Sequence, residues 1–255
     1  MNKNSIKAVE LFNEGKYEES IKEFEELAVA DPLDFSLFNN IATAYFKLGK
    51  FGKAIENYIK ALEINSKPLE IYQNLAEAYK NNGEMLDAIL TLQTASALHP
   101  ENIDVKYHLA KLYKDDVQFD LAMGELEVIL DQEPEHLDAH YDIAGVYFEM
   151  GLYENTISHL NKVLETVDNS ADIHFSIATA YYANDEMDKA LCHLLQAISV
   201  NPAYYPAYKK LGIVLMAKEE YEEAVDYFEQ YLKCDLPEDE KDEIKAVIER
   251  INKKN

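Results

Sequence analysis

The sequence predicts an all-α fold, an α-solenoid built from helix-turn-helix hairpins, on two observations. The first is a pattern of apolar and small residues that recurs every 34 residues along most of the 255-residue chain. The second is that apolar residues within each copy follow the spacing of two short helices, and no stretch alternates as a strand does. A hairpin of two short helices cannot bury both apolar faces by itself, so the copies must stack on one another.

The stretch 35–68 shows the hairpin most clearly. Its first helix has one apolar face, formed by Phe38, Ile41, Ala42 and Tyr45. Gly49 ends this helix, and the second helix carries Ala54, Tyr58 and Ala61 on its packing face. Because two small residues flank one aromatic residue there, two helix axes can approach to about 8–10 Å.

The arrangement of Tyr45, Gly49, Phe51, Ala54, Tyr58 and Ala61 resembles the tetratricopeptide repeat (TPR), a family of helix-turn-helix units that stack into a right-handed superhelix. The same signature recurs before and after this stretch without an insertion. The resemblance divides the chain into seven repeat units, at residues 1–34, 35–68, 69–102, 103–136, 137–170, 171–204 and 205–238.

The turn inside each unit is the least regular element along the chain. Gly15, Gly49, Gly83 and Gly151 occupy it in four units, which suggests a positive φ angle. Val117, Asp185 and Glu219 stand at the same place in the fourth, sixth and seventh units. Since a β-branched residue is costly at positive φ, we expect Asp115 and Asp116 to reshape the turn at Val117.

The segment 239–255 is predicted to form a helix that caps the last hairpin. After an acidic first turn, one face is apolar, formed by Ile244, Val247, Ile248 and Ile251. Such a cap keeps a repeat array soluble. The alternative is a detachable helix that binds a partner.

Charge and composition restrict the function classes. The formal net charge is −24, so the surface repels phosphate backbones, and we expect neither nucleic acid nor direct membrane insertion. The N-terminal residues lack the apolar core of a signal peptide, and no apolar run is long enough to cross a bilayer. Cys192 and Cys234 are too few for a disulfide framework. We therefore expect a cytoplasmic protein with free thiols.

No motif indicates catalysis. The chain has no phosphate-binding loop and no glycine-rich dinucleotide turn after a strand. His136 and His140 lie four residues apart, and His159 and His193 occupy equivalent places in neighbouring units. His140 and His174 replace aromatic packing residues, and four-coordinate zinc requires further ligands. The sequence therefore predicts no enzyme, no cofactor and no metal site.

The resemblance implies a binding function, because TPR proteins hold extended or helical peptides in a concave groove. Packing residues take the fourth, seventh, eighth and eleventh places of each unit. The second, fifth, ninth and twelfth places then form a neighbouring stripe, which the resemblance places in the groove. The N-terminal half of this stripe is polar, and the amide side chains of Asn40 and Asn74 lie beside it. Its C-terminal half is predicted to contain Tyr107, Tyr141, Gly145, Phe148, Phe175, Thr179, Tyr182, Ile213 and Met216.

The character of the stripe predicts the ligand. Gly145 and Thr179 are small residues between aromatic ones, a pattern suited to a pocket for an inserted side chain. An acidic row, Glu70, Asp104, Asp138 and Asp172, runs beside it. We therefore expect a protein or peptide with apolar anchors flanked by basic residues. The alternative is ordinary packing, since aromatic residues at these places are common in the family.

Two functions remain open at this point. The first is a scaffold or adaptor that binds a protein segment, and the second is a regulatory sensor of a short signalling peptide that acts on a separate effector chain. Family members that bind chaperone C-terminal tails use a clamp of Lys, Asn and Arg residues over three units. Only Asn74 matches that clamp, and Asp104 would repel a terminal carboxylate, so a chaperone tail is not expected.

Overall fold

The computed structural model describes residues 3–167 and 170–253, and within them it contains fifteen α-helices and no strands. The six residues 1–2, 168–169 and 254–255, which belong to the predicted first, fifth and C-terminal segments, lie outside this description. The helices are α1 (Lys3–Asn13), α2 (Tyr17–Ala30), α3 (Phe35–Lys47), α4 (Phe51–Ile64), α5 (Leu69–Asn81), α6 (Met85–Leu98), α7 (Ile103–Asp115), α8 (Phe119–Gln132), α9 (Leu137–Glu149), α10 (Tyr153–Thr166), α11 (Ala171–Ala183), α12 (Met187–Val200), α13 (Tyr205–Ala217), α14 (Tyr221–Tyr231) and α15 (Glu238–Asn252).

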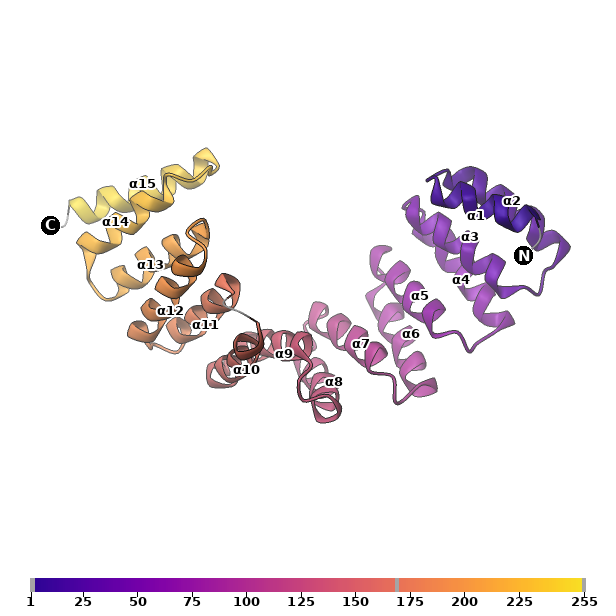
Figure 1. Cartoon of the computed structure of the whole chain (residues 1–255), viewed down its shortest axis with the longest axis horizontal. Helices are drawn as coiled ribbons and strands as arrows, with labels where there is room; N and C mark the ends of the chain where they lie inside the picture. The colour runs from indigo at the N-terminus through magenta and orange to yellow at the C-terminus, as the bar shows by residue number, and fades with distance from the viewer. Residues whose placement is uncertain (1–2, 168–169, 254–255) are drawn as a thin grey trace. The chain divides into compact units, whose positions relative to one another are not determined.

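The chain forms two compact parts, Met1–Asp131 and Gln132–Asn255. In the N-terminal part each helix from α1 to α6 packs on the next, and in the C-terminal part the same holds from α9 to α14. Figure 1 shows these neighbours as helical hairpins that follow one another along the chain. The prediction of an all-α solenoid is confirmed.

The seven turns within the hairpins share one backbone conformation. The four turn glycines have φ angles between 68° and 82°. The turn residue donates its N–H to the carbonyl three residues before it, and the next residue donates to the carbonyl five residues before it. In the turn at Gly83 these bonds are 3.1 and 2.9 Å long. This is the pattern of a left-handed C-terminal helix cap, which satisfies carbonyls that the helix leaves without partners.

The expectation that Asp115 and Asp116 reshape the turn at Val117 is wrong. Val117 has φ +61°, and Asp185 and Glu219 both have φ +63°. The Val117 and Gln118 N–H groups donate to the Lys114 and Tyr113 carbonyls at 3.1 and 2.8 Å, as in the glycine turns. Hydrogen bonding and the packing of both flanking helices therefore fix the left-handed conformation, although a β-branched residue disfavours it.

The core of the N-terminal part follows the predicted packing faces. Ala54 and Ala61 are fully buried, and Tyr58 between them is 2% exposed. They form one cluster with Ala42, Ile71 and neighbouring residues, with Phe38 and Tyr45 partly buried at its edge. A fully buried large apolar side chain contributes roughly 1.5–3 kcal/mol, so this aromatic residue stabilises the contact between hairpins.

The last helix, α15, packs on α14 in the C-terminal part. Ile244 and Ile251 join a buried cluster with Leu215, Phe228 and Tyr231. Glu240 anchors the first turn of α15, because it accepts a hydrogen bond from Lys209 at 2.6 Å and one from Tyr231 at 2.9 Å. The helix therefore covers apolar residues of α13 and α14 and is held by a buried face and a polar contact.

Two further observations concern the described residues. None of their helices combines the length and the apolar character needed to cross a membrane. Both cysteines are free: Cys192 on α12 is exposed, whereas Cys234 after α14 is buried, and burial raises the pKa of its thiol.

Candidate functional site

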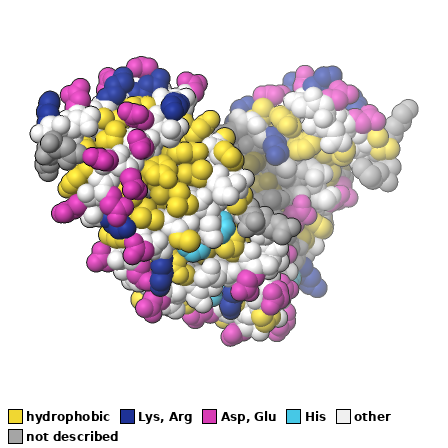
Figure 2. Space-filling view, turned by 60° about the vertical axis from the view of Figure 1, so that its left-hand side comes forward, with side chains coloured by type: hydrophobic (Ala, Val, Ile, Leu, Met, Phe, Trp, Pro, Cys, Tyr) yellow, Lys and Arg dark blue, Asp and Glu magenta, His cyan; other side chains and the backbone are white. Residues whose placement is uncertain are grey.

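The first helices of the C-terminal hairpins, α9, α11 and α13, carry most of the predicted stripe. Tyr141 on α9 is 46% exposed, and Phe175 and Tyr182 on α11 are half-buried. Phe175, Tyr182 and Tyr204 pack at the edge of one apolar cluster, so their rings have one side on the core. Figure 2 shows a continuous area of hydrophobic side chains bordered by acidic ones on the C-terminal part, which faces the viewer.

Tyr204 occupies the N-cap position of α13, and three side chains lie close to it. Its ring meets Phe175 edge-on, with ring centroids 5.6 Å apart. Burial, a hydrogen bond from its hydroxyl to Asp172, and the nearby Tyr141 together raise the pKa of Tyr204 to about 12. The tyrosine therefore stays protonated and keeps Asp172 as its acceptor. We call Tyr141, Phe175, Tyr182 and Tyr204 the aromatic face.

Lys210 of α13 lies against this face. Its ammonium sits 4.5 Å from the centroid of the Tyr182 ring, a cation–π contact. Burial lowers the pKa of Lys210. Sequence reasoning missed both Lys210 and Tyr204, because neither occupies a place in the predicted stripe.

The small residues of the stripe have different surroundings. Gly145 on α9 is exposed, and a Cβ built there meets no heavy atom within 4 Å, so open space lies beside it. The Thr179 hydroxyl instead donates to the Phe175 carbonyl of its own helix at 2.9 Å. Phe148, one turn after Gly145, is half-buried and contacts Tyr153 with ring centroids 5.5 Å apart.

Ile213 and Met216 lie in a different environment from the aromatic face. Both are partly buried and pack against the cluster that contains Phe228, Ile244 and Ile251. The structure therefore places these two predicted site residues beside α14 and α15, where they contribute to the packing of the last hairpin.

The predicted site residues of the N-terminal part lie on α3, α5 and α7. Tyr107 on α7 is half-buried, with the Lys111 ammonium 5.5 Å from its ring centroid. Asn74 on α5 is half-buried. Asn40 on α3 lines a pocket of about 380 Å³ together with Val9, Asp31, Asp34 and other residues of α1 to α3.

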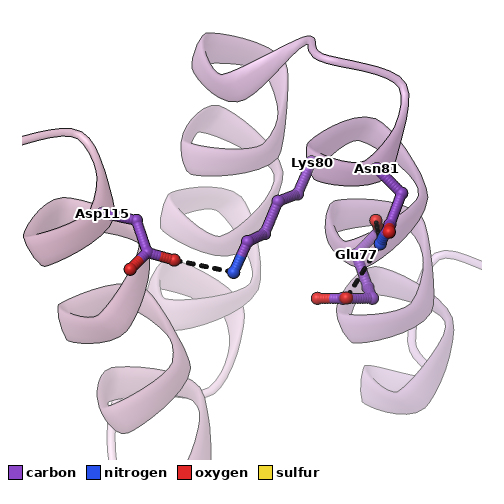
Figure 3. A network of polar contacts seen from close by, with 4 residues as sticks. All are labelled: Glu77, Lys80, Asn81 and Asp115. Atoms are coloured by element: carbon purple, nitrogen blue, oxygen red, sulfur yellow. Dashed lines mark hydrogen bonds and ion pairs between the residues drawn. The ribbon is translucent and has the colours of Figure 1, made fainter. Parts of the chain in front are cut away.

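A second pocket, of about 310 Å³, lies between α5, α6 and α7. It is lined by Gln73, Ala76, Glu77, Lys80, Leu92, His108, Lys111 and Leu112. Two of its polar side chains are already engaged, as Figure 3 shows. Lys80 forms an ion pair with Asp115 at 2.7 Å, and Glu77 accepts a hydrogen bond from Asn81 at 2.8 Å.

The histidines form pairs that sequence spacing did not reveal. His140 of α9 and His159 of α10 have their Nδ1 atoms 2.8 Å apart, and His174 of α11 and His193 of α12 have theirs 3.1 Å apart. Tyr147 and Tyr181 complete the two groups, with centroids 5.5 Å from His159 and His193. Within the described residues, no group of three or more His, Cys, Asp and Glu side chains is arranged to hold a metal ion.

Comparison with protein families gives three matches within the chain. A TPR repeat model matches residues 42–83, and tetratricopeptide repeat models match residues 69–102 and 175–239. No curated protein matches the chain.

Several solved structures share the fold. The C-terminal part of a TPR repeat-containing protein from Cytophaga hutchinsonii is 18% identical, with a TM-score of 0.78, covering 91% of this chain and 95% of that one. A tetratricopeptide repeat protein from Parabacteroides merdae is 19% identical, with a TM-score of 0.67 and 97% of both chains covered.

A third similar structure is YrrB, described as a TPR protein with an unusual peptide-binding site. It is 21% identical, with a TM-score of 0.61, covering 77% of this chain and 97% of YrrB. At these identities the likeness concerns the fold. The family matches and the repeated helical hairpins lead to one conclusion: this chain is a tetratricopeptide repeat protein.

Proposed function

We propose that this protein is a non-enzymatic interaction scaffold that binds a peptide or protein segment along the first helices of its hairpins. The observation that carries the proposal is the aromatic face, in which the Phe175, Tyr182 and Tyr204 rings rest on the core and Tyr141 is 46% exposed. Exposed apolar surface on a folded chain is typical of interaction sites, and partly buried aromatic residues dominate the energy of many interfaces.

Three further features support a protein ligand. The open space beside Gly145 leaves room for an inserted side chain next to the aromatic face. Tetratricopeptide repeats are generally protein-interaction folds, and YrrB is described as having a peptide-binding site. A net charge of −24 argues against a nucleic-acid ligand, because the chain would repel the phosphate backbone.

The test is selection of peptides from a displayed random library on the intact chain. Selected peptides are then measured against the triple variant Tyr141→Ala, Phe175→Ala, Tyr182→Ala. We expect the variant to keep its helical circular dichroism and to lose binding by at least about tenfold, because truncating one buried aromatic anchor already costs about 2 kcal/mol or more.

The matched control removes three exposed apolar side chains from second helices. Leu86 and Leu90 on α6 and Leu195 on α12 are 67%, 49% and 47% exposed. Their replacement by Ala is expected to leave peptide binding unchanged. Peptides that bound a folded aromatic-face variant as tightly as the intact chain, or a library that yielded no binder, would refute the proposal.

A further inference from the structure

Among the described lysines of the C-terminal part that are half-buried, Lys210 is the one without an ion pair, whereas the exposed Lys162 and Lys233 also form none. Lys189, Lys209, Lys218, Lys241, Lys245 and Lys253 each form an ion pair with an Asp or Glu, at 2.5 to 3.7 Å. Lys210 forms none with the described carboxylates, although the chain has 48 acidic and 24 basic residues. Its described partner is the ring of Tyr182. A half-buried cation that remains unpaired in so acidic a chain requires an explanation.

The contacts of the aromatic face and the burial of Lys210 give that explanation. Asp172 is held by the Tyr204 hydroxyl and is therefore engaged in another contact. Lys210 is half-buried, and burial lowers the pKa of its ammonium because part of its hydration is lost. A carboxylate arriving from outside would replace that hydration with a charge-assisted hydrogen bond.

We propose that Lys210 and Tyr182 form a subsite for an acidic side chain, Asp or Glu, of a segment whose aromatic or large aliphatic neighbour packs against Phe175 and Tyr204. The proposal rests on the proposed function and adds the chemistry of its ligand. Charge complementarity identifies the occupant, since the subsite offers one cation beside three aromatic rings.

A side-chain carboxylate fits better than a chain terminus. A terminal carboxylate is usually fixed by several donors at once, whereas Lys210 is the sole cation described against the aromatic face. Asp138 on α9 and Asp172 on α11 remain acidic neighbours, so the ligand needs its negative charge on the side facing α13. This adds an acidic residue to the apolar and basic ligand expected from the sequence.

The experiment uses short synthetic peptides with amidated C-termini and the full chain. Each peptide carries one Phe and one Glu at varied separation, with a matched peptide that has Gln in place of Glu, and binding is followed by fluorescence anisotropy. We expect the intact chain to prefer the best Glu peptide over its Gln partner by about threefold to tenfold, the usual range for a partly buried charged contact.

Three variants test whether the preference for the Glu peptide depends on Lys210. Lys210→Gln is expected to abolish this preference, and Lys210→Arg is expected to retain it. Lys162→Gln, which removes an exposed lysine of the second helix α10, is expected to leave it unchanged. Equal binding of Glu and Gln peptides by the intact chain, or a preference that survives Lys210→Gln, would overturn the subsite while leaving the scaffold proposal in place.

The remaining outcomes concern the source of the carboxylate and the proposed function itself. The side-chain assignment would be overturned by two observations together. Amidated peptides would show no preference for Glu over Gln, and peptides with a free C-terminus would bind more tightly in a way that depends on Lys210. The proposed function and the subsite would both fail on two results together: no synthetic peptide binds the intact chain, and the library-selected peptides bind the aromatic-face triple variant as tightly as they bind the intact chain.

Discussion

At the scale of single residues, Val117 shows how strongly the repeat fixes its turns. Its φ of +61° lies in the left-handed region, which costs an L-residue about 1–2 kcal/mol. The conformational cost is larger for a β-branched side chain. The side chain is 67% exposed, so it gains little from packing in return. The turn is therefore maintained by the two flanking helices and the two backbone hydrogen bonds.

We predict that Val117→Gly stabilises the protein by about 0.5–1 kcal/mol, because relief of backbone strain exceeds the extra entropy that Gly loses on folding. The measurement is the midpoint of urea unfolding. Gly83→Val, the reverse change at the equivalent turn, is the control and is expected to lower the midpoint. A Val117→Gly protein with an unchanged or lower midpoint would contradict this account of the turn.

At the scale of elements, each of the two histidine pairs joins the two helices of one hairpin in the C-terminal part. The His140 Nε2 lies 2.8 Å from the Pro134 carbonyl oxygen, so this nitrogen carries the proton and donates it. Its Nδ1 is then an acceptor, and the His159 Nδ1–H donates to it. Protonation of both rings would place two N–H donors against each other, so the α9–α10 contact requires at least one neutral ring.

This contact predicts a loss of stability in weak acid. Burial, followed by the effects of His140 and Lys162, lowers the pKa of His159 from 6.5 to about 4. The unfolded chain therefore binds a proton at higher pH than the folded chain does. The stabilisation is complete above pH 6.5 and declines as pH falls from 6.5 toward 4.

The measurement is the melting temperature as a function of pH. We expect His159→Asn, which copies Asn57 at the same place in α4, to flatten the decline between pH 6.5 and 5, where few carboxylates titrate. Asn57→Ala, at the equivalent place in α4, serves as the control and is expected to leave the slope unchanged, because it removes no titratable group. An equally steep decline in the His159 variant would show that another group is responsible.

The last helix gives the second prediction at this scale. We propose that α15 acts as a cap, since Ile244 and Ile251 cover Phe228 and Tyr231. Deletion of residues 239–255 is expected to lower the melting temperature and to cause self-association, because this apolar face becomes exposed. Light scattering and thermal unfolding measure both effects, and deletion of residues 253–255 alone is the control. A truncated chain that remained monomeric and equally stable would rule out the cap.

At the scale of the whole molecule, the sequence predicts the fold much better than the site. Ala54, Tyr58 and Ala61 recur at a fixed spacing, and burial of that pattern requires stacked hairpins, so the architecture follows from periodicity alone. The sequence alone mispredicts the turn at Val117, because the packing of the helices on either side overrides the local backbone preference of this residue.

The site depends on contacts between elements that periodicity does not encode. The stripe identified Tyr141, Phe175 and Tyr182, because one helix face determines their direction. Tyr204 and Lys210 come from the start of α13 and reach α11 through the packing of two hairpins. The histidine partners are 19 residues apart and meet only across a hairpin. Such pairs become visible when the helices are placed in space.

The aromatic face also has a spectroscopic consequence. The chain contains 18 tyrosines and no tryptophan, and Tyr141, Tyr182 and Tyr204 lie on this one face. A bound segment that carries tryptophan would bring the sole indole of the complex next to these phenol rings. Excitation energy absorbed by the tyrosines would then be transferred to the tryptophan of the ligand and emitted there. Occupancy of the face could therefore be measured with unlabelled protein, from the shift of the fluorescence emission to longer wavelength.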